Sequence, residues 1–180
     1  MRPRTRLAFA AALAGLVGMA LPAGGAVDAP ADAHGSPIPR GELREVKRAT
    51  ARYHSLRTAR ADGFSAFSLD PNNPDVPTCF DSPDGGMGVH FVRHIDDVLD
   101  PNDPEALVYE VKRTGRVKLV AVEYIVPEEF VDPDDPPMLF GEMLHHHPFL
   151  PVYILHAWIW KANPDGVFAD FNPRVDACPG

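Results

Sequence analysis

Apolar residues recur at steps of three and four positions over residues 41–61, with lysines and arginines between them. Leu43, Val46 and Tyr53 fall on one side of a 3.6-residue repeat, as expected for a helix with one apolar face. Gly63 follows directly and is typical of a position just beyond a helix end. The pattern predicts an amphipathic helix over residues 41–61.

Four later segments have the length and the content of β-branched and aromatic residues that are typical of strands. A short glycine-containing loop joins the second to the third, which favours a hairpin. Two longer proline-rich connections flank this group, and the second is expected to hold a short helical turn at 139–144. A final short strand is expected at 167–171. The four main predicted strands are 86–92, 105–111, 116–126 and 151–160.

One helix followed by mostly antiparallel strands predicts an α+β domain. We expect the N-terminal helix to pack on a curved sheet or partly open barrel of four to five strands. Residues 41–180 are enough for one domain with a single core. Residues 27–40 are rich in Ala, Asp, Pro and Gly and are expected to form a flexible arm.

Residues 1–26 have the pattern of a secretory signal peptide, with three arginines, an apolar stretch and then small residues. The apolar stretch is too short, and has the wrong flanks, for a retained membrane span. Cleavage is expected after Ala26, or as late as Ala33, which would leave His34 as the first residue. The mature protein is therefore expected to be secreted, or periplasmic if the host has an outer membrane, with no membrane span after signal removal.

The whole chain has a formal charge of −8, and removal of three signal-peptide arginines makes it more acidic. Such a balance gives no electrostatic basis for binding nucleic acid or an anionic membrane surface. A small-molecule ligand remains compatible with the composition. The oligomeric state is not determined by the sequence.

The sequence contains two cysteines, Cys79 and Cys178. In an oxidising compartment they are expected to form one disulfide, which closes a loop of about 100 residues. The alternative is two free thiols. Neither cysteine has a neighbour at metal-ligand spacing.

Three of the predicted strands carry an ionisable residue among apolar ones: His90, Glu123 and His156. Because side chains alternate between the faces of a strand, Glu123 is expected on one face with Leu119 and Ile125. A buried carboxylate requires partners or a metal ion. Two histidines and a carboxylate are the donors of catalytic zinc sites and of facial-triad iron sites, and we expect zinc or copper before iron.

Two further histidines are candidate additional ligands. His54 lies on the predicted helix, and His147 is the last of three consecutive histidines in a predicted loop. Adjacent side chains in an extended loop point in alternate directions, so at most one or two of the run can reach one ion.

A second interpretation stays open at this point. The protein would be a non-enzymatic binding or structural protein, and the histidines and the glutamate would form a polar core satisfied by tyrosines or the backbone. The sequence identifies neither a catalytic residue nor a substrate.

Several motifs occur in a characteristic order: ATARYH, GGMGVHFV, PEALVYE, KLVAVEYIVP, LFG and LHAWIWKANPDGVFADFNPRV. Over about residues 49–178 they resemble a family of exported bacterial proteins with no established activity. The resemblance implies that Cys79, His90, Glu123, His156 and Cys178 belong to the family's motifs. His34 and the histidine run lie outside those motifs.

Overall fold

A computed structural model describes residues 40–178 of the chain. The predicted signal peptide with its cleavage sites, His34, and the predicted arm up to residue 39 lie outside the described residues. Within the described part, no helix combines the length and the apolar character that crossing a membrane requires.

The described elements follow in the order α1 (Arg40–Thr50), the 3₁₀ helix η1 (Ala51–His54), α2 (Leu56–Ala61), β1 (Ser65–Ala66), β2 (Cys79–Ser82), β3 (Gly85–Val92), β4 (Ala106–Val111), β5 (Val117–Pro127), the 3₁₀ helix η2 (Glu128–Phe130), β6 (Met138–Leu139), β7 (Glu142–Met143), β8 (His145–His146) and β9 (Val152–Ala157).

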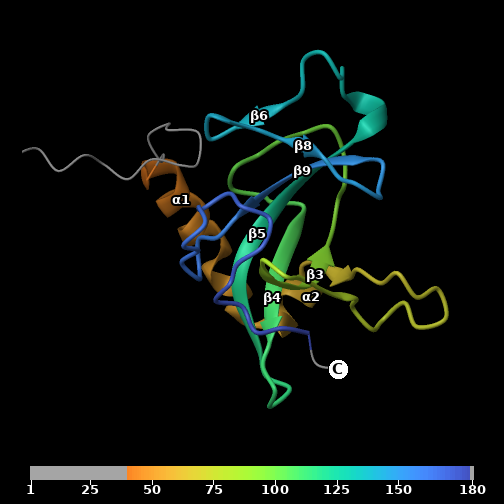
Figure 1. Cartoon of the computed structure of the whole chain (residues 1–180), viewed down its shortest axis with the longest axis vertical. Helices are drawn as coiled ribbons and strands as arrows, with labels where there is room; N and C mark the ends of the chain where they lie inside the picture. Colours follow the sequence, from red (N-terminus) through yellow and green to blue (C-terminus); the bar gives the residue numbers. More distant parts are fainter. Residues whose placement is uncertain (1–39, 179–180) are drawn as a thin grey trace, which may run out of the picture.

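Seven of these strands form one antiparallel sheet in the order β1-β3-β4-β5-β9-β8, and β2 pairs with β3 beside β1. The short strands β6 and β7 form a separate hairpin. The helical segment lies along one side of the sheet (Figure 1). The predicted α+β fold is confirmed, and the sheet is open and does not close into a barrel.

The predicted helix is interrupted at Ser55. Its side chain accepts a hydrogen bond from the backbone N–H of Thr58 at 3.3 Å and caps a new helix, so α2 begins there. The predicted end is confirmed, because Gly63 has a φ of 95° and Phe64 donates to the carbonyl of Ala59. This is the Schellman arrangement that terminates many helices.

The four main predicted strands are present as β3, β4, β5 and β9, although β9 ends at Ala157. The predicted helical turn at 139–144 is wrong: Phe140 and Gly141 both have positive φ, which suits a tight hairpin turn between β6 and β7. The predicted strand at 167–171 is also wrong, because that segment consists of turns and bends. Its neighbour Asn172 instead makes a single bridge to Gly86.

The two faces of the sheet have different partners. One face packs against the helices through a large apolar cluster that includes Val46 and Tyr53 from the helical segment and Leu107 and Tyr124 from the sheet. The other face carries smaller clusters, one of them covered by Trp158 and Val175 from the C-terminal segment.

A β-bulge in β5 decides which face Glu123 occupies. Val108 pairs with Ala121, whereas Tyr109 pairs with Leu119, so Val120 is an extra residue between the two pairs. Leu119 therefore packs in the helix-side cluster, while Ala121 belongs to a cluster on the opposite face. The prediction that Leu119 shares a face with Glu123 is wrong for this reason.

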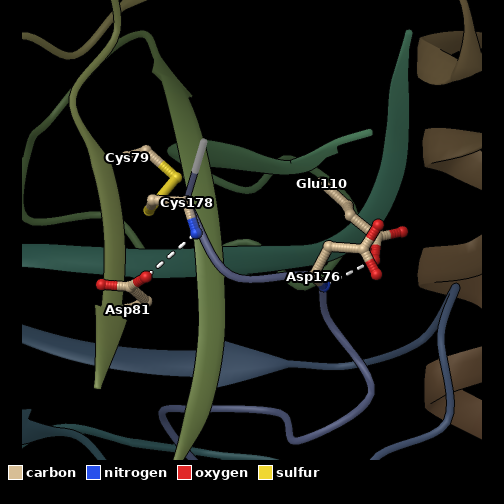
Figure 2. The surroundings of a disulfide bond; sticks show 5 residues. All are labelled: Cys79, Asp81, Glu110, Asp176 and Cys178. Atoms are coloured by element: carbon tan, nitrogen blue, oxygen red, sulfur yellow. Dashed lines mark hydrogen bonds between the residues drawn. A yellow bond between two sulfur atoms is a disulfide. The ribbon is translucent and has the colours of Figure 1, made fainter. Parts of the chain in front are cut away.

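The C-terminal segment is fastened across the sheet at several points. Cys178 forms a disulfide with Cys79, which confirms the predicted pairing, and its backbone N–H donates to Asp81 at 2.9 Å. Glu110 accepts the backbone N–H of Asp176 at 2.9 Å (Figure 2).

Close approach between backbones explains the glycine at position 85. A Cβ at Gly85, which has a φ of 141°, would lie 2.5 Å from the backbone carbon of Asn172. The absence of a side chain at Gly85 therefore lets the C-terminal segment pass next to β3.

We expect loss of the disulfide to destabilise the protein without changing its fold. The bridge spans 99 positions, and the chain-entropy model gives a loop of that size up to about 4–5 kcal/mol. The double variant Cys79→Ser/Cys178→Ser should lose about 2–5 kcal/mol in urea unfolding. Treatment of the wild-type protein with a reductant should give the same loss, and an unchanged midpoint in both cases would contradict the prediction.

Glu105 is expected to make stability depend on pH. This side chain is buried, and burial raises its pKa to about 7, although its carboxylate accepts the backbone N–H of Ile125 at 3.0 Å. The unfolded chain releases the proton at lower pH, so the free energy of unfolding should fall as pH rises from about 4.5 to about 7.

The variant Glu105→Gln keeps an acceptor for the backbone N–H of Ile125 and should remove the decrease of the free energy of unfolding with pH. At pH 8 we expect it to exceed the wild type by up to about 3 kcal/mol in urea unfolding, with a difference near zero at pH 4.5. Glu129→Gln, at an exposed position of η2, is the matched control. An equal gain at both pH values for Glu105→Gln would refute the mechanism.

Candidate metal centre

His90, Glu123 and His156 meet on the sheet face that lies away from the helices. Glu123 of β5 is directly opposite His156 of β9, and on its other side it is opposite Ala106 of β4. His90 of β3 is opposite Val108 of β4, two positions from Ala106 and therefore on the same face of β4. Because Ala106 carries only a methyl group, the long Glu123 side chain can reach across β4 to His90.

The two carboxylate oxygens of Glu123 each face one imidazole. His90 Nε2 lies 3.5 Å from Glu123 Oε2, and His156 Nε2 lies 3.4 Å from Glu123 Oε1. One donor atom from each of the three residues lies within 4.8 Å of the other two. The edge of a tetrahedral zinc site with bonds of about 2.0–2.1 Å is roughly 3.4 Å long. The spacing of the donors therefore fits a transition-metal ion.

All three side chains are buried, and several ring nitrogens of the two histidines lack a hydrogen-bond partner. His156 is completely buried, and His90 and Glu123 are 5% and 6% exposed. Within residues 40–178, His90 Nδ1 and both ring nitrogens of His156 have no hydrogen-bond partner. Buried polar atoms in folded proteins are nearly always paired. Nε2 of His156, which faces Glu123 at 3.4 Å, therefore indicates a missing ligand at the centre of the group.

The environment keeps one histidine neutral and places the other beside negative charge. Burial lowers the pKa of His90 to about 3, so its imidazole is neutral and has a free lone pair. Burial alone would lower the pKa of His156, but Glu123 and Asp170 outweigh it and raise that pKa. Burial raises the pKa of Glu123 despite the opposing effect of His156.

Sequence reasoning missed Asp170, which lies in the C-terminal segment. Its Oδ1 is 3.5 Å from Nδ1 of His156 and 3.2 Å from Nε2 of His145. Burial alone would raise the pKa of Asp170, but its interactions with these two histidines lower it. Asp170 lies within the segment 167–171 that was predicted as a strand, and no ligand spacing marks it in the sequence.

The remaining candidate histidines have separate positions. His54 lies on η1, exposed and edge-on to Trp160 at 4.3 Å between ring centroids, and so on the helix side of the sheet rather than at the site. His145 and His146 form strand β8 and pair with β9, where a loop was predicted. His147 lines a cavity together with His90 and Glu123.

The hydrogen bonds accepted by Nδ1 of His147 argue against His147 as a metal ligand. Nδ1 accepts the backbone N–H groups of Phe149 and Leu150 at 3.2 and 3.1 Å, so the proton of the neutral ring is on Nε2. Burial lowers the pKa of His147, which favours this neutral form. A protonated Nε2 is a hydrogen-bond donor and has no lone pair for a metal ion.

A cavity of about 520 Å³ opens onto the group. His90, Glu123 and Asp170 belong to its wall, whereas His156 lies behind them and has no solvent-exposed surface. Most of the other wall residues are apolar, among them Phe80, which meets the His90 ring edge-on. The volume lies in the range of pockets for small organic molecules.

Comparisons with models of protein families, with curated proteins and with solved structures find no match to this chain. The resemblance to a family of exported proteins therefore stays a prediction.

A comparison of Glu123 with Glu110, a second buried glutamate, tests whether Glu123 contributes to the stability of the fold. Glu110 is also completely buried, but Lys161 and Lys112 lie 2.5 and 2.8 Å from its oxygens. Burial alone would raise the pKa of Glu110, and the two lysines outweigh it and lower that pKa. Glu110 is therefore stabilised as a carboxylate, while Glu123 is not.

In metal-free protein we expect Glu123→Gln to leave the free energy of unfolding unchanged or to raise it by up to about 2 kcal/mol, because it removes a costly buried charge. Glu110→Gln should lower it by about 3 kcal/mol or more, because two lysines lose their partner. Urea unfolding at pH 7 in the presence of a chelator measures both. Equal losses for the two variants would show that Glu123 is a structural residue like Glu110.

Proposed function

We propose that the protein binds one divalent transition-metal ion through His90, Glu123 and His156, and uses it on a small molecule that enters the adjoining cavity. Zinc is the favoured metal, because two imidazoles and one carboxylate are common ligands of catalytic zinc, and copper is the second candidate. The observation that carries the proposal is the convergence of three buried ionisable side chains, with Nε2 of His156 left without a hydrogen-bond partner among the described residues.

The structural alternative predicts that tyrosines or backbone groups satisfy the histidines. In the described residues, the hydroxyls of Tyr109 and Tyr124 bond to backbone carbonyls elsewhere. Among the described residues, the ionisable groups within 4.0 Å of the His156 ring nitrogens are Glu123 and Asp170, at 3.4 and 3.5 Å. These contacts support a ligand site over a satisfied polar core.

Asp170 is suited to orient His156 as a ligand. A carboxylate that accepts the Nδ1–H of a histidine fixes its tautomer and directs the Nε2 lone pair toward the metal. Asp170 Oδ1 faces Nδ1 of His156, while Nε2 of the same ring faces Glu123. The proposed centre thus has its three ligands and an outer carboxylate.

Three protein ligands leave at least one coordination position open, as in catalytic zinc sites. Since His90 and Glu123 belong to the cavity wall, this position is proposed to face the cavity. A zinc ion there supplies Lewis acidity, which activates water or polarises a carbonyl group. We therefore place the reaction in the class of metal-assisted additions of water.

The compartment is part of the same proposal. A disulfide is typical of proteins in oxidising environments, and Cys79–Cys178 is present. This supports action outside the cytoplasm, as the predicted signal peptide requires.

The test is zinc binding by protein exported through its own signal and stripped with a chelator. Isothermal titration calorimetry should give one equivalent of zinc, and cobalt substitution should give the visible absorption of a four-coordinate site. We expect His90→Ala and His156→Ala to lose this binding. His54→Ala, on the helix side of the sheet, should retain it.

Asp170→Asn provides a graded comparison, because loss of an outer carboxylate typically weakens metal binding about 10- to 100-fold. Its cobalt spectrum should keep the four-coordinate form, since no ligand is removed. The proposal fails if the wild type takes up no zinc, copper or cobalt, or if His156→Ala binds as much as the wild type.

A further inference from the structure

The charged groups on the cavity wall already have partners within the protein. Glu123 lies between two imidazoles, Asp170 faces His156 and His145, and Asp81 accepts the backbone N–H of Cys178. Of the described residues that line the cavity, none is a lysine or an arginine. An anionic ligand would find no cationic side chain there, and a cationic one would have to displace an existing contact.

The rest of the wall is apolar, and this character continues to the entrance. Phe67, Phe80 and Ile154 line the interior, and the lining residues Leu69 and Phe149 are 57% and 89% exposed. Exposed apolar side chains are informative where they gather at one place, and Leu69, Ile95 and Phe149 all line this cavity. An apolar molecule entering the cavity would cover them.

Among the described side chains on this wall, His147 offers a neutral hydrogen-bond donor. Because Nδ1 of His147 accepts two backbone N–H groups, Nε2–H is the only polar atom that this ring can offer to a ligand. The same two contacts fix the 147–150 turn and hence the ring. A rigid neutral donor on the same wall as His90 and Glu123 suits an uncharged oxygen acceptor such as the carbonyl of an ester, an amide or a ketone.

We infer that the cavity takes an uncharged, largely apolar small molecule with a carbonyl group, whose oxygen is held by His147 Nε2–H beside the metal. This inference rests on the proposed metal centre for the second contact to the carbonyl, but the apolar wall and His147 are present without metal. The two proposals can therefore be tested separately.

The probe is prodan, a neutral naphthyl ketone whose fluorescence shifts to the blue in apolar surroundings. It should bind to zinc-loaded protein with a blue shift, and more weakly to zinc-free protein. Anilinonaphthalene sulfonate, an anion, and dansylcadaverine, a cation, have similar aromatic bodies. In zinc-free protein both should bind at least about tenfold more weakly than prodan, because each would bury an unpaired charge.

His147→Asn is the informative variant. The Asn side-chain oxygen can occupy the position of Nδ1 and keep the contacts to Phe149 and Leu150, but nothing replaces Nε2–H. We expect prodan affinity to fall about three- to tenfold, as for loss of one hydrogen bond, with zinc affinity unchanged. His146→Asn, at an exposed position beside Tyr153, is the matched control and should bind as the wild type does.

A steric variant gives an independent measurement. Val152 lines the cavity at the start of β9 and is partly exposed, so Val152→Trp should fill the space and abolish prodan binding while the protein stays folded. Binding that survives this change would place prodan elsewhere and overturn the inference.

The remaining outcomes separate the two proposals. Stoichiometric zinc binding without prodan binding, or equal affinity for the charged dyes, would overturn the ligand class and leave the metal centre intact. Prodan binding that Val152→Trp abolishes and His147→Asn weakens, but that zinc does not change, would support the ligand class. It would contradict the role of the metal in holding the carbonyl group.

Discussion

The pairing of β5 with β9 places Glu123 directly opposite His156, and the site depends on this register. A shift of β9 by one residue would turn His156 to the helix face, where the large apolar cluster lies, and would leave Glu123 on the opposite face without it. The bulge at Val120 adds a second condition. Because of the extra residue, side chains before and after Val120 that would otherwise share a face of β5 lie on opposite faces. Pairing and bulge together bring a carboxylate and two imidazoles to one face.

The two buried glutamates show what this arrangement costs. Glu110 has two lysines and a backbone N–H as partners, so its burial is compensated by charge and hydrogen bonds. Within residues 40–178, the ion-pair partners of Glu123 are two imidazoles at 3.4–3.5 Å, one of them kept neutral by its own burial. A group whose pKa is shifted by desolvation next to specific partners, and that opens to a cavity, is typical of functional sites.

The C-terminal segment connects this site to the rest of the fold. It supplies Asp170, and it is held by the bridge to Gly86, by the contacts of Glu110 with Asp176, and by the disulfide at Cys178. The disulfide partner Cys79 begins β2, and the next residue of β2, Phe80, packs on His90. One covalent bond thus fastens both the outer carboxylate and one wall of the cavity.

Local pattern accounted for much of this fold. The 3.6-residue repeat located the helical segment, and runs rich in β-branched and aromatic residues located β3, β4, β5 and β9, because both features lie in residues close together in the chain. The short strands β1, β2 and β8 carry no such signal: two to four residues hold too little pattern, and their pairing depends on a distant partner. The break at Ser55 was missed since the apolar repeat continues across it.

The sequence by itself determined which residue types are present to form a site: His90, Glu123 and His156 stand out because ionisable groups among apolar strand residues require partners. It also determined the pair of cysteines, since only two are present. Only the tertiary structure decided that the three side chains meet, that Asp170 joins them, that His54 lies on the far side of the sheet, and that His147 is a donor. The physical reason is that sheet register, a bulge and the path of the C-terminal segment are set by contacts between residues far apart in the chain, which no local pattern records.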